Sequence, residues 1–481
     1  MRARALALAA LALAGAAGAG AARAGAAPRA APPPVARTVT VAPGGAAAAL
    51  AAAGPGDTLV LAPGTHPGPL VITAPLTLRG TPGARIEGGG RGTVLTVAVA
   101  GATVEDLALE GSGADIMNID AAVHIVRGAG VTLRRLRVRD VLYGVYAEHA
   151  DSARIEDCDL SGRVEHTGVA LDASGAAMAG DGSGNGIHLW SCSAARISGN
   201  AVRHFQDAVY MSFTNRTAIE SNILTANGRF GLHTMYCQQN RLRSNQFMRN
   251  VAGCAIMFSN HLDVRDNDFA FNRGSRTYGL LLKDCSDGDF NDNRMIGNTI
   301  AVFMDNSNRN RFRGNLFQNN GWGLFIFSSC AGNQFAANDF IRNDYPVALD
   351  MRYTDNRFDD GGRGNYWDEN PVYDLDGDGV GDVPYSPVGA FAFVSKQYPD
   401  LTVLAKSPAV VALGVAERVM PALRPSEALD RHPLVRPVAV PPSRAAGDAA
   451  ASAPRAWGAL AMSLAMLGAG LAGLRRAGSR S

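Results

Sequence analysis

Seven short segments of the chain share one pattern: RISGNAV (196–202), AIESNIL (218–224), LRSNQF (242–247), VRDNDF (264–269), FNDNRM (290–295), FRGNLF (312–317) and FAANDF (335–340). Each follows an apolar strand and a polar turn, and each contains an asparagine at an equivalent place. These asparagines lie 22 to 26 residues apart, at Asn200, Asn222, Asn245, Asn267, Asn293, Asn315 and Asn338. A fixed period of this length is typical of a solenoid, in which each repeat buries its apolar side by stacking on its neighbours.

The strands of each repeat are short and rich in Ile, Val, Leu and Phe, and helical spacing is not sustained over three turns. Equivalent residues of successive coils should stack about 4.8 Å apart, so that an inward asparagine at a bend can bond to the next one. A second asparagine set recurs about five residues later, at Asn227, Asn250, Asn272, Asn298, Asn320 and Asn343. The sequence therefore predicts an all-β fold, a right-handed parallel β-helix with asparagine ladders. The regular apolar alternation argues against the alternative, an Asn-rich disordered tract.

The two ends of the chain have different compositions. Residues 1–24 resemble a secretory signal peptide, with two arginines, an Ala/Leu run and a small-residue cleavage region, and residues 25–37 resemble a linker. We expect the β-helix over 38–365, a C-terminal cap over 366–410 and a Pro/Ala-rich linker over 411–456. Residues 457–474 form a charge-free apolar run followed by arginines, which predicts a C-terminal membrane anchor; a secreted Ala-rich helix is the alternative.

Counting back from each repeat asparagine predicts which side chains of the preceding strand point outward. The outward set contains His188 in one coil, His233, Met235 and Cys237 two coils later, and Met257 in the coil after that. Imidazole, thioether and thiolate groups favour Cu(I) over hard cations, so these five residues form a candidate copper site. Methionine also fills gaps in cores, and a one-residue register shift would turn all five inward, so a structural role stays open.

Six cysteines in an exported protein raise the question of disulfides. Cys192, Cys237, Cys285 and Cys330 occupy one column in every second coil, about 9.6 Å apart, which is too far for a disulfide. We expect no bridges within this column, and we expect Cys158 and Cys254 to pack as small apolar residues.

Near the C-terminal cap, the sequence DLDGDGVGD (374–382) resembles the first half of a calcium-binding loop. Asp374, Asp376, Asp378 and Asp382 could supply oxygen ligands to one Ca²⁺ ion that stabilises the cap. A series of Asp-Gly turns would give the same string without a metal.

Composition excludes some functions. The formal net charge of +2 and the absence of a basic run interleaved with aromatic residues argue against nucleic-acid binding. No recurring pair of carboxylates with a basic partner marks a catalytic cleft, and the Glu148–His149 and Glu165–His166 pairs are typical of solvated turns. We therefore predict no enzymatic activity.

Several motifs carry a resemblance to a known family: GDTLVLAPGTHPGPLVITAPLTLRG (56–80), GNGIHLW (184–190), GLHTMYC (231–237), AIMFSN (255–260) and GNYWDENPVYDLDGDGVGDVPY (364–385). From Thr38 to Val410 the chain resembles the NosD-type maturation proteins of nitrous oxide reductase. The resemblance implies a periplasmic β-helix without enzymatic activity that works with an ABC transporter, both its ATPase and its membrane subunit. Such a protein would help to mature the copper centre of the reductase, by handling copper or by docking the reductase. The motif positions that match are His188, Met235 and Met257.

Other functions are compatible with a β-helix. A polysaccharide lyase, an epimerase or a glycan-binding module would act on or bind sugar polymers, and a surface solenoid would be purely structural. Depolymerisation of a uronate polymer by the purified protein would support the enzyme, and sugar binding without turnover would support the module.

Overall fold

The structure is a computed structural model that describes residues 36–163, 184–274, 277–351, 353–398, 407–420 and 428–438, together with Leu401 and Leu404. The expected signal peptide (1–24) and the expected membrane anchor (457–474) lie outside the described residues. Among the residues that are described, no helix has both the length and the apolar character needed to cross a membrane.

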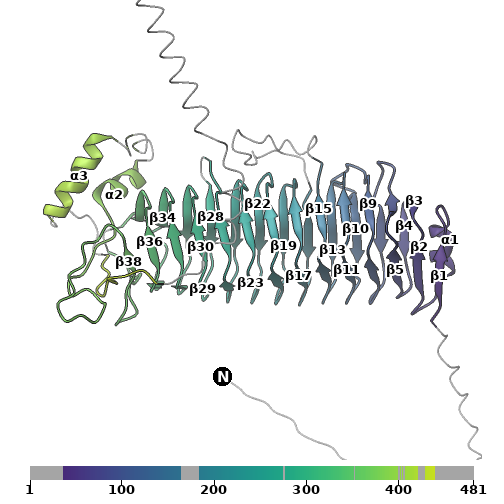
Figure 1. The fold of residues 1–481 in the computed structure, drawn as a ribbon, viewed down its shortest axis with the longest axis horizontal. Helices are drawn as coiled ribbons and strands as arrows, with labels where there is room; N and C mark the ends of the chain where they lie inside the picture. Colours follow the sequence, from purple (N-terminus) through teal and green to yellow (C-terminus); the bar gives the residue numbers. More distant parts are fainter. Residues whose placement is uncertain are drawn as a thin grey trace, which may run out of the picture. The chain divides into compact units, whose positions relative to one another are not determined.

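Three parallel sheets run along the successive coils of the chain (Figure 1). Sheet A contains β1 (Thr38–Val41), β2 (Thr58–Leu61), β5 (Thr77–Gly80), β8 (Thr103–Glu105), β11 (Thr132–Arg134), β14 (Arg154–Glu156), β17 (Arg196–Ser198), β20 (Ala218–Glu220), β23 (Arg241–Arg243), β26 (Asp263–Arg265), β29 (Asp289–Asn291), β32 (Arg311–Arg313) and β35 (Gln334–Ala336).

Sheet B contains β3 (Gly64–Pro67), β6 (Ala84–Glu87), β9 (Ala108–Glu110), β12 (Arg137–Arg139), β15 (Asp159–Ser161), β18 (Ala201–Arg203), β21 (Ile223–Thr225), β24 (Gln246–Met248), β27 (Asp268–Ala270), β30 (Arg294–Ile296), β33 (Leu316–Gln318), β36 (Asp339–Ile341) and β38 (Tyr366–Trp367). Sheet C contains β4 (Leu70–Ile72), β7 (Leu95–Val97), β10 (Ala121–Val126), β13 (Tyr143–Glu148), β16 (Ile187–Trp190), β19 (Asp207–Ser212), β22 (Phe230–Met235), β25 (Ala252–Met257), β28 (Tyr278–Lys283), β31 (Ile300–Asp305), β34 (Trp322–Ile326) and β37 (Tyr345–Leu349). Every strand pair is parallel and joins neighbouring coils, which confirms the predicted parallel β-helix.

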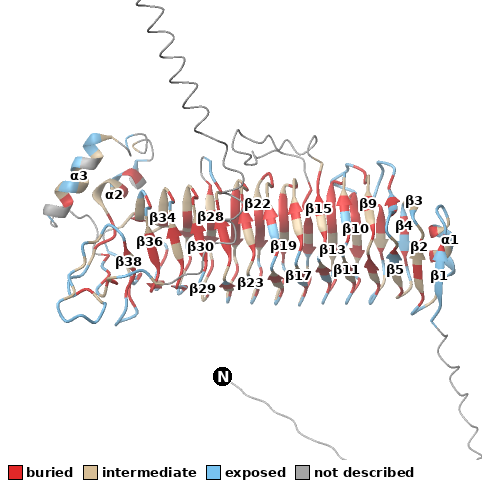
Figure 2. Cartoon of the chain, in the orientation of Figure 1, coloured by how far each residue is buried: buried red, intermediate tan, exposed pale blue. Residues whose placement is uncertain are grey.

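The core lies inside the coils, where the alternate apolar residues of all three sheets meet (Figure 2). Because each coil places its inward residue directly over that of the previous coil, identical side chains stack. The rings of Phe290 and Phe312 lie 4.6 Å apart and those of Phe317 and Phe340 lie 4.5 Å apart, each pair nearly parallel. The repeated phenylalanine of the sequence pattern therefore forms ladders within the core.

The asparagine ladder is confirmed as a run of side-chain amides bonded from coil to coil. The Oδ1 of Asn222 accepts hydrogen bonds from the backbone N–H and Nδ2 of Asn200, at 2.9 and 3.0 Å, and the same pair of bonds recurs through Asn338. The predicted second ladder runs from Asn227 to Asn343 in the same way. A third, shorter ladder, which the sequence analysis missed, joins Asn310, Asn333 and Asn356.

The first ladder continues one coil further and ends on a carboxylate. Asn338 bonds to Asn365, and the backbone N–H of Asn365 donates to Asp430 Oδ2 at 2.7 Å. The indole Nε1 of Trp367 donates to the same oxygen at 2.8 Å. A carboxylate only accepts hydrogen bonds, so Asp430 ends the series without leaving a buried amide N–H₂ group that lacks an acceptor.

The outer corner of sheet C differs from the prediction. We predicted that Cys237 points outward, and the same strict alternation would turn Phe213, Tyr236 and Phe258 inward. Instead Cys237 is buried and the three aromatic residues lie at the surface, with Phe213 52% and Tyr236 45% exposed. The reason is that each aromatic residue has left-handed backbone, with φ of +51°, +56° and +52°, respectively. A left-handed residue reverses the strand alternation, so the side chain after it returns to the interior.

The same reversal, at Ser191 and Asp284, places Cys192 and Cys285 inside, and Cys330 of the same column is buried as well. All six cysteines are free and buried. The prediction that no disulfide forms within the column is confirmed. The thiols alternate with hydroxyl groups in the intervening coils: the backbone N–H of Cys237 donates to Ser259 Oγ, and that of Cys285 donates to Ser307 Oγ.

Among the described residues, three helices lie outside the sheets. Helix α1 (Ala46–Ala52) covers the first coils with the buried side chains of Ala46 and Leu50. Helix α2 (Ala390–Gln397) packs on β37, where the rings of Phe391 and Tyr345 lie 5.5 Å apart.

The last described part of the chain differs from the linker expected over 411–456. Helix α3 (Pro408–Val419) pairs with α2, since Glu417 Oε1 accepts from the backbone N–H of Ala390. Residues 428–438 then return to the solenoid, where Leu434 pairs in parallel with Tyr366 and the N–H of Val438 donates to Asp339 Oδ1. The described elements that close the end of the coils thus extend to Val438.

Candidate metal site on the outer face of sheet C

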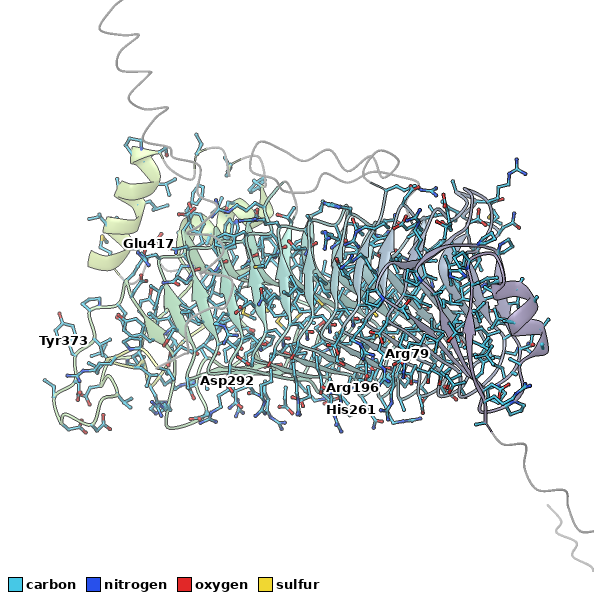
Figure 3. The ribbon with its side chains drawn as sticks, turned by 45° about the vertical axis from the view of Figure 1, so that its right-hand side comes forward. Arg79, Arg196, His261, Asp292, Tyr373 and Glu417 are labelled. Atoms are coloured by element: carbon cyan, nitrogen blue, oxygen red, sulfur yellow. The ribbon has the colours of Figure 1, made fainter. Side chains whose placement is uncertain are left out.

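The outer face of sheet C carries a column of rings from successive coils. The pairing of the strands aligns His124 with Tyr146, Tyr146 with His188, His188 with Tyr210, and Tyr210 with His233. The ring centroids of these neighbours lie 5.3, 4.3, 4.6 and 5.0 Å apart in that order. Sheet A, by contrast, carries charged pairs such as Arg196 with Glu220 at 2.9 Å; Arg79 and Arg196 lie along its outer face (Figure 3).

Two methionines occupy the neighbouring outward column, two residues further along each strand. Met235 in β22 is aligned with Met257 in β25, and both side chains are half-buried. Since paired positions of adjacent strands are about 4.8 Å apart, two flexible thioethers here can reach one ion. His233 lies on the same face of β22 as Met235, about 6.6 Å away along the strand.

His233 is held by a buried ion pair. Asp207, in β19, is fully buried and lies with its Oδ2 3.3 Å from His233 Nδ1 and 2.6 Å from Arg229 Nη2. Burial raises the pKa of the Asp207 carboxyl, but the hydrogen bonds from Arg229 and His233 outweigh this and lower it overall. Asp207 is therefore ionised at neutral pH and accepts a hydrogen bond from the Nδ1–H group of His233.

This contact leaves the other ring nitrogen of His233 available. Nε2 is buried and has no hydrogen-bond partner among the described residues. A histidine whose Nδ1–H is bound to a carboxylate presents a fixed, more basic Nε2, which is the arrangement found behind many metal-binding histidines. One imidazole nitrogen and two thioethers form a donor set that suits Cu(I).

The other predicted copper ligands do not join this group. His188 lies two coils from His233, and the ring of Tyr210 stands between them. Its Nδ1 accepts from Asn185 Nδ2 at 3.0 Å, and burial lowers the pKa of His188 to about 4, so the ring is neutral. The Sγ of Cys237 points into the core, and burial raises its pKa to about 11. The alternation error described above explains why Cys237 was wrongly placed on this face.

A ridge of aromatic rings borders the two methionines. Phe213, Tyr236 and Phe258 follow Ser212, Met235 and Met257 in sequence, and their rings stack 5.2 and 4.8 Å apart, tilted by 6° and 11°. Because ring faces cover one another, mostly ring edges are exposed. Each coil therefore places an apolar ring directly after the methionine column.

The predicted calcium ligands lie beyond the C-terminal coils, next to Tyr373, and away from the methionines in the middle coils (Figure 3). The structure brings Asp374, Asp376 and Asp382 together, with carboxylate oxygens within 4.8 Å of one another. Asp378 is not part of this group, and its Oδ1 accepts from the backbone N–H of Val380 at 2.7 Å. Three carboxylates are a donor set that fits a hard cation such as Ca²⁺.

Sequence reasoning missed the residues that support His233. Tyr210, His124 and Tyr146 have no role in the site predicted from the sequence. All of them could have been found by extending the outward column over more coils. Asp207 and Arg229 carry no repeat signal, so only the structure brings them to His233.

Comparison with known proteins identifies relatives of this chain. A sequence model of the NosD family, described as periplasmic copper-binding protein, matches residues 173–371. A protein of Pseudomonas aeruginosa named as a probable ABC transporter binding protein NosD is 31% identical over 393 residues, which cover 79% of this chain and 89% of that protein. The protein of the same name from Stutzerimonas stutzeri is 28% identical, covering 78% and 85%.

Solved structures similar to this chain are also parallel β-helices. The A-modules of the Azotobacter vinelandii mannuronan C-5 epimerases AlgE6 and AlgE4 align with TM-scores of 0.51 and 0.50. Each alignment covers 64% of this chain and 90% or 92% of the module, at 15% and 17% identity, and so shows the fold alone. The extent of the sequence match to the Pseudomonas protein, by contrast, shows that this chain belongs to the NosD family, whose members are described as periplasmic copper-binding proteins.

Proposed function

We propose that this protein is a periplasmic accessory factor, without enzymatic activity, that handles copper during maturation of nitrous oxide reductase. It would work with an ABC transporter, because the two curated relatives are both named as transporter binding proteins. The reductase as the final recipient of the copper rests on the motif resemblance of the sequence.

The observation that carries the proposal is the His233–Met235–Met257 group. His233, whose buried Nε2 has no hydrogen-bond partner among the described residues, lies on the same face of the sheet as two thioethers on adjacent coils. Thioethers bind Cu(I) without deprotonation and release it readily, so the site suits transient loading rather than permanent storage. Copper is therefore a cargo in this proposal.

The chain's own residues would prepare the site. Asp207 holds the proton of His233 on Nδ1, so that Nε2 keeps its lone pair. Arg229 neutralises Asp207, which allows the carboxylate to remain buried next to the ring. The stacked ring edges of Phe213, Tyr236 and Phe258 keep water from one side of the sulfurs.

The test replaces both methionines by leucine, which preserves volume and apolarity. Purified Met235→Leu/Met257→Leu protein should compete less well than the unmodified protein for Cu(I) held by a chromophoric chelator. Met117→Leu is the matched control, because Met117 is 88% exposed but lies in a loop outside the site. In cells that make the double variant, the reductase should be short of copper. Unchanged copper affinity together with a fully loaded reductase would reject the proposal.

A further inference from the structure

Tyr210 contacts two members of the candidate site. Its ring meets the ring of His233 edge to face at 5.0 Å, and its hydroxyl donates to the sulfur of Met235, with an oxygen–sulfur distance of 3.7 Å. The other side of the ring is covered by His188 at 4.6 Å. The ring position is thus fixed by stacking, independently of the hydroxyl group.

The direction of the hydrogen bond is set by the surroundings of Tyr210. A tyrosine hydroxyl is protonated at neutral pH and can donate one hydrogen bond. The thioether of Met235 has no proton to donate, so the phenol must be the donor. Sulfur is left with one lone pair engaged by Tyr210.

The hydrogen bond from Tyr210 to Met235 cannot be equally strong in the copper-free and the copper-bound site. A sulfur that donates electrons to a copper cation is a poorer hydrogen-bond acceptor than a free sulfur, and the cation repels the phenol proton. An interaction that is stronger in the metal-free state lowers the affinity for the metal by the same free-energy difference.

Resting on the function proposed above, we propose that Tyr210 weakens the hold of Met235 on Cu(I), and so speeds release of the ion, by competing for the methionine sulfur. The tyrosine is a positioning residue and does not itself bind the metal. It would keep the affinity of the site low enough for the cargo to leave.

The test is Tyr210→Phe in the full-length protein, which keeps the ring and removes the hydroxyl. Given the usual net strength of a hydrogen bond, Cu(I) should bind about three- to tenfold more tightly and leave for a chelator correspondingly more slowly. Tyr146→Phe is the matched control: Tyr146 stacks between two histidines of the same column, and no hydrogen bond joins it to either methionine of the site. It should behave like the unmodified protein.

A second background distinguishes this mechanism from a general structural effect. In Met235→Leu protein the sulfur is absent, so adding Tyr210→Phe should change neither the affinity nor the rate of copper release. Weaker or unchanged binding by Tyr210→Phe, or an effect that persists without Met235, would overturn the inference while leaving the proposed function standing. Unmodified protein that shows no Cu(I) binding at the two methionines would overturn both.

Discussion

The asparagine ladder allows a quantitative prediction for the substitution Asn267→Ala. Asn267 is fully buried in the middle of the ladder. Its Oδ1 accepts from the backbone N–H and Nδ2 of Asn245, at 2.9 and 3.0 Å. Its Nδ2 donates to the carbonyl oxygens of Leu242 and Arg265 and to Asn293 Oδ1, at 2.8 to 3.0 Å. Alanine removes all five of these bonds. The backbone N–H of Asn245 loses the acceptor that holds it in the ladder, while Asn293 keeps its bond from the backbone N–H of residue 267.

The magnitude follows from these partners. An orphaned buried N–H costs about 1–3 kcal/mol, and the loss of the remaining satisfied bonds adds about 1 kcal/mol. We therefore expect the free energy of unfolding to fall by about 2–4 kcal/mol. Denaturant unfolding of the purified protein, followed by circular dichroism, measures this difference from the shift of the midpoint.

A control in the next coil makes the comparison strict. Asn291 lies in β29, is half-buried and belongs to none of the three ladders. Asn291→Ala should change the free energy of unfolding by less than about 0.5 kcal/mol. If the two alanine variants unfold at the same midpoint, the ladder does not stabilise the coils as argued.

Four further predictions follow from other sites. Asp207→Asn should lower the Cu(I) affinity about 10- to 100-fold, as loss of a carboxylate behind a ligand histidine commonly does. The control Asp263→Asn, on sheet A, should not change the affinity. If both variants compete equally well with the chelator, Asp207 does not support the copper site. Calcium should raise the melting temperature, Asp376→Ala should abolish that rise and Asp378→Ala should not, as measured by thermal unfolding with and without a chelator. Burial raises the pKa of Asp430 to about 6, above its unfolded value of about 3.9. The contribution of Asp430 to stability is therefore present below pH 4 and is lost as the pH rises through 6. In unfolding experiments, the stability advantage of the unmodified protein over Asp430→Asn should shrink between pH 4 and 7. Truncation after residue 450 should release the protein into the soluble periplasmic fraction, and full-length protein that is already soluble after osmotic shock would refute the anchor predicted over 457–474.

The sequence pattern was sufficient to predict the coils and their ladders because each coil must satisfy the same buried groups. A bend that recurs every 22 to 26 residues needs a polar side chain of one size in one place, and asparagine appears there in the printed sequence. The end of the ladder could not be predicted in this way. Asp430 follows Asn365 by 65 residues, outside any period, and only the return of residues 428–438 to the solenoid brings them together.

The error at the corner of sheet C has a different cause. Left-handed backbone is usually signalled by Gly, Asn or Asp, and the equivalent positions of later coils are indeed Asp284 and Asn306, with φ of +54° and +44°. At Phe213, Tyr236 and Phe258 the sequence gives no such signal. Strict strand alternation was therefore assumed to hold through Tyr236, and this gave the wrong orientation for Cys237.

These corner residues also connect the fold to the site. A bulky aromatic residue is strained in left-handed backbone. Three consecutive coils therefore each hold an aromatic residue in an unfavourable backbone conformation. The three coils concerned are those that carry Tyr210, His233, Met235 and Met257. The corners of the following two coils, where the methionine column gives way to Lys283 and Asp305, have residues that suit the conformation. Backbone strain, ring stacking and soft donor atoms thus coincide in one part of sheet C, which is where a weakly held Cu(I) ion would be shielded from water on one side and open to a recipient on the other.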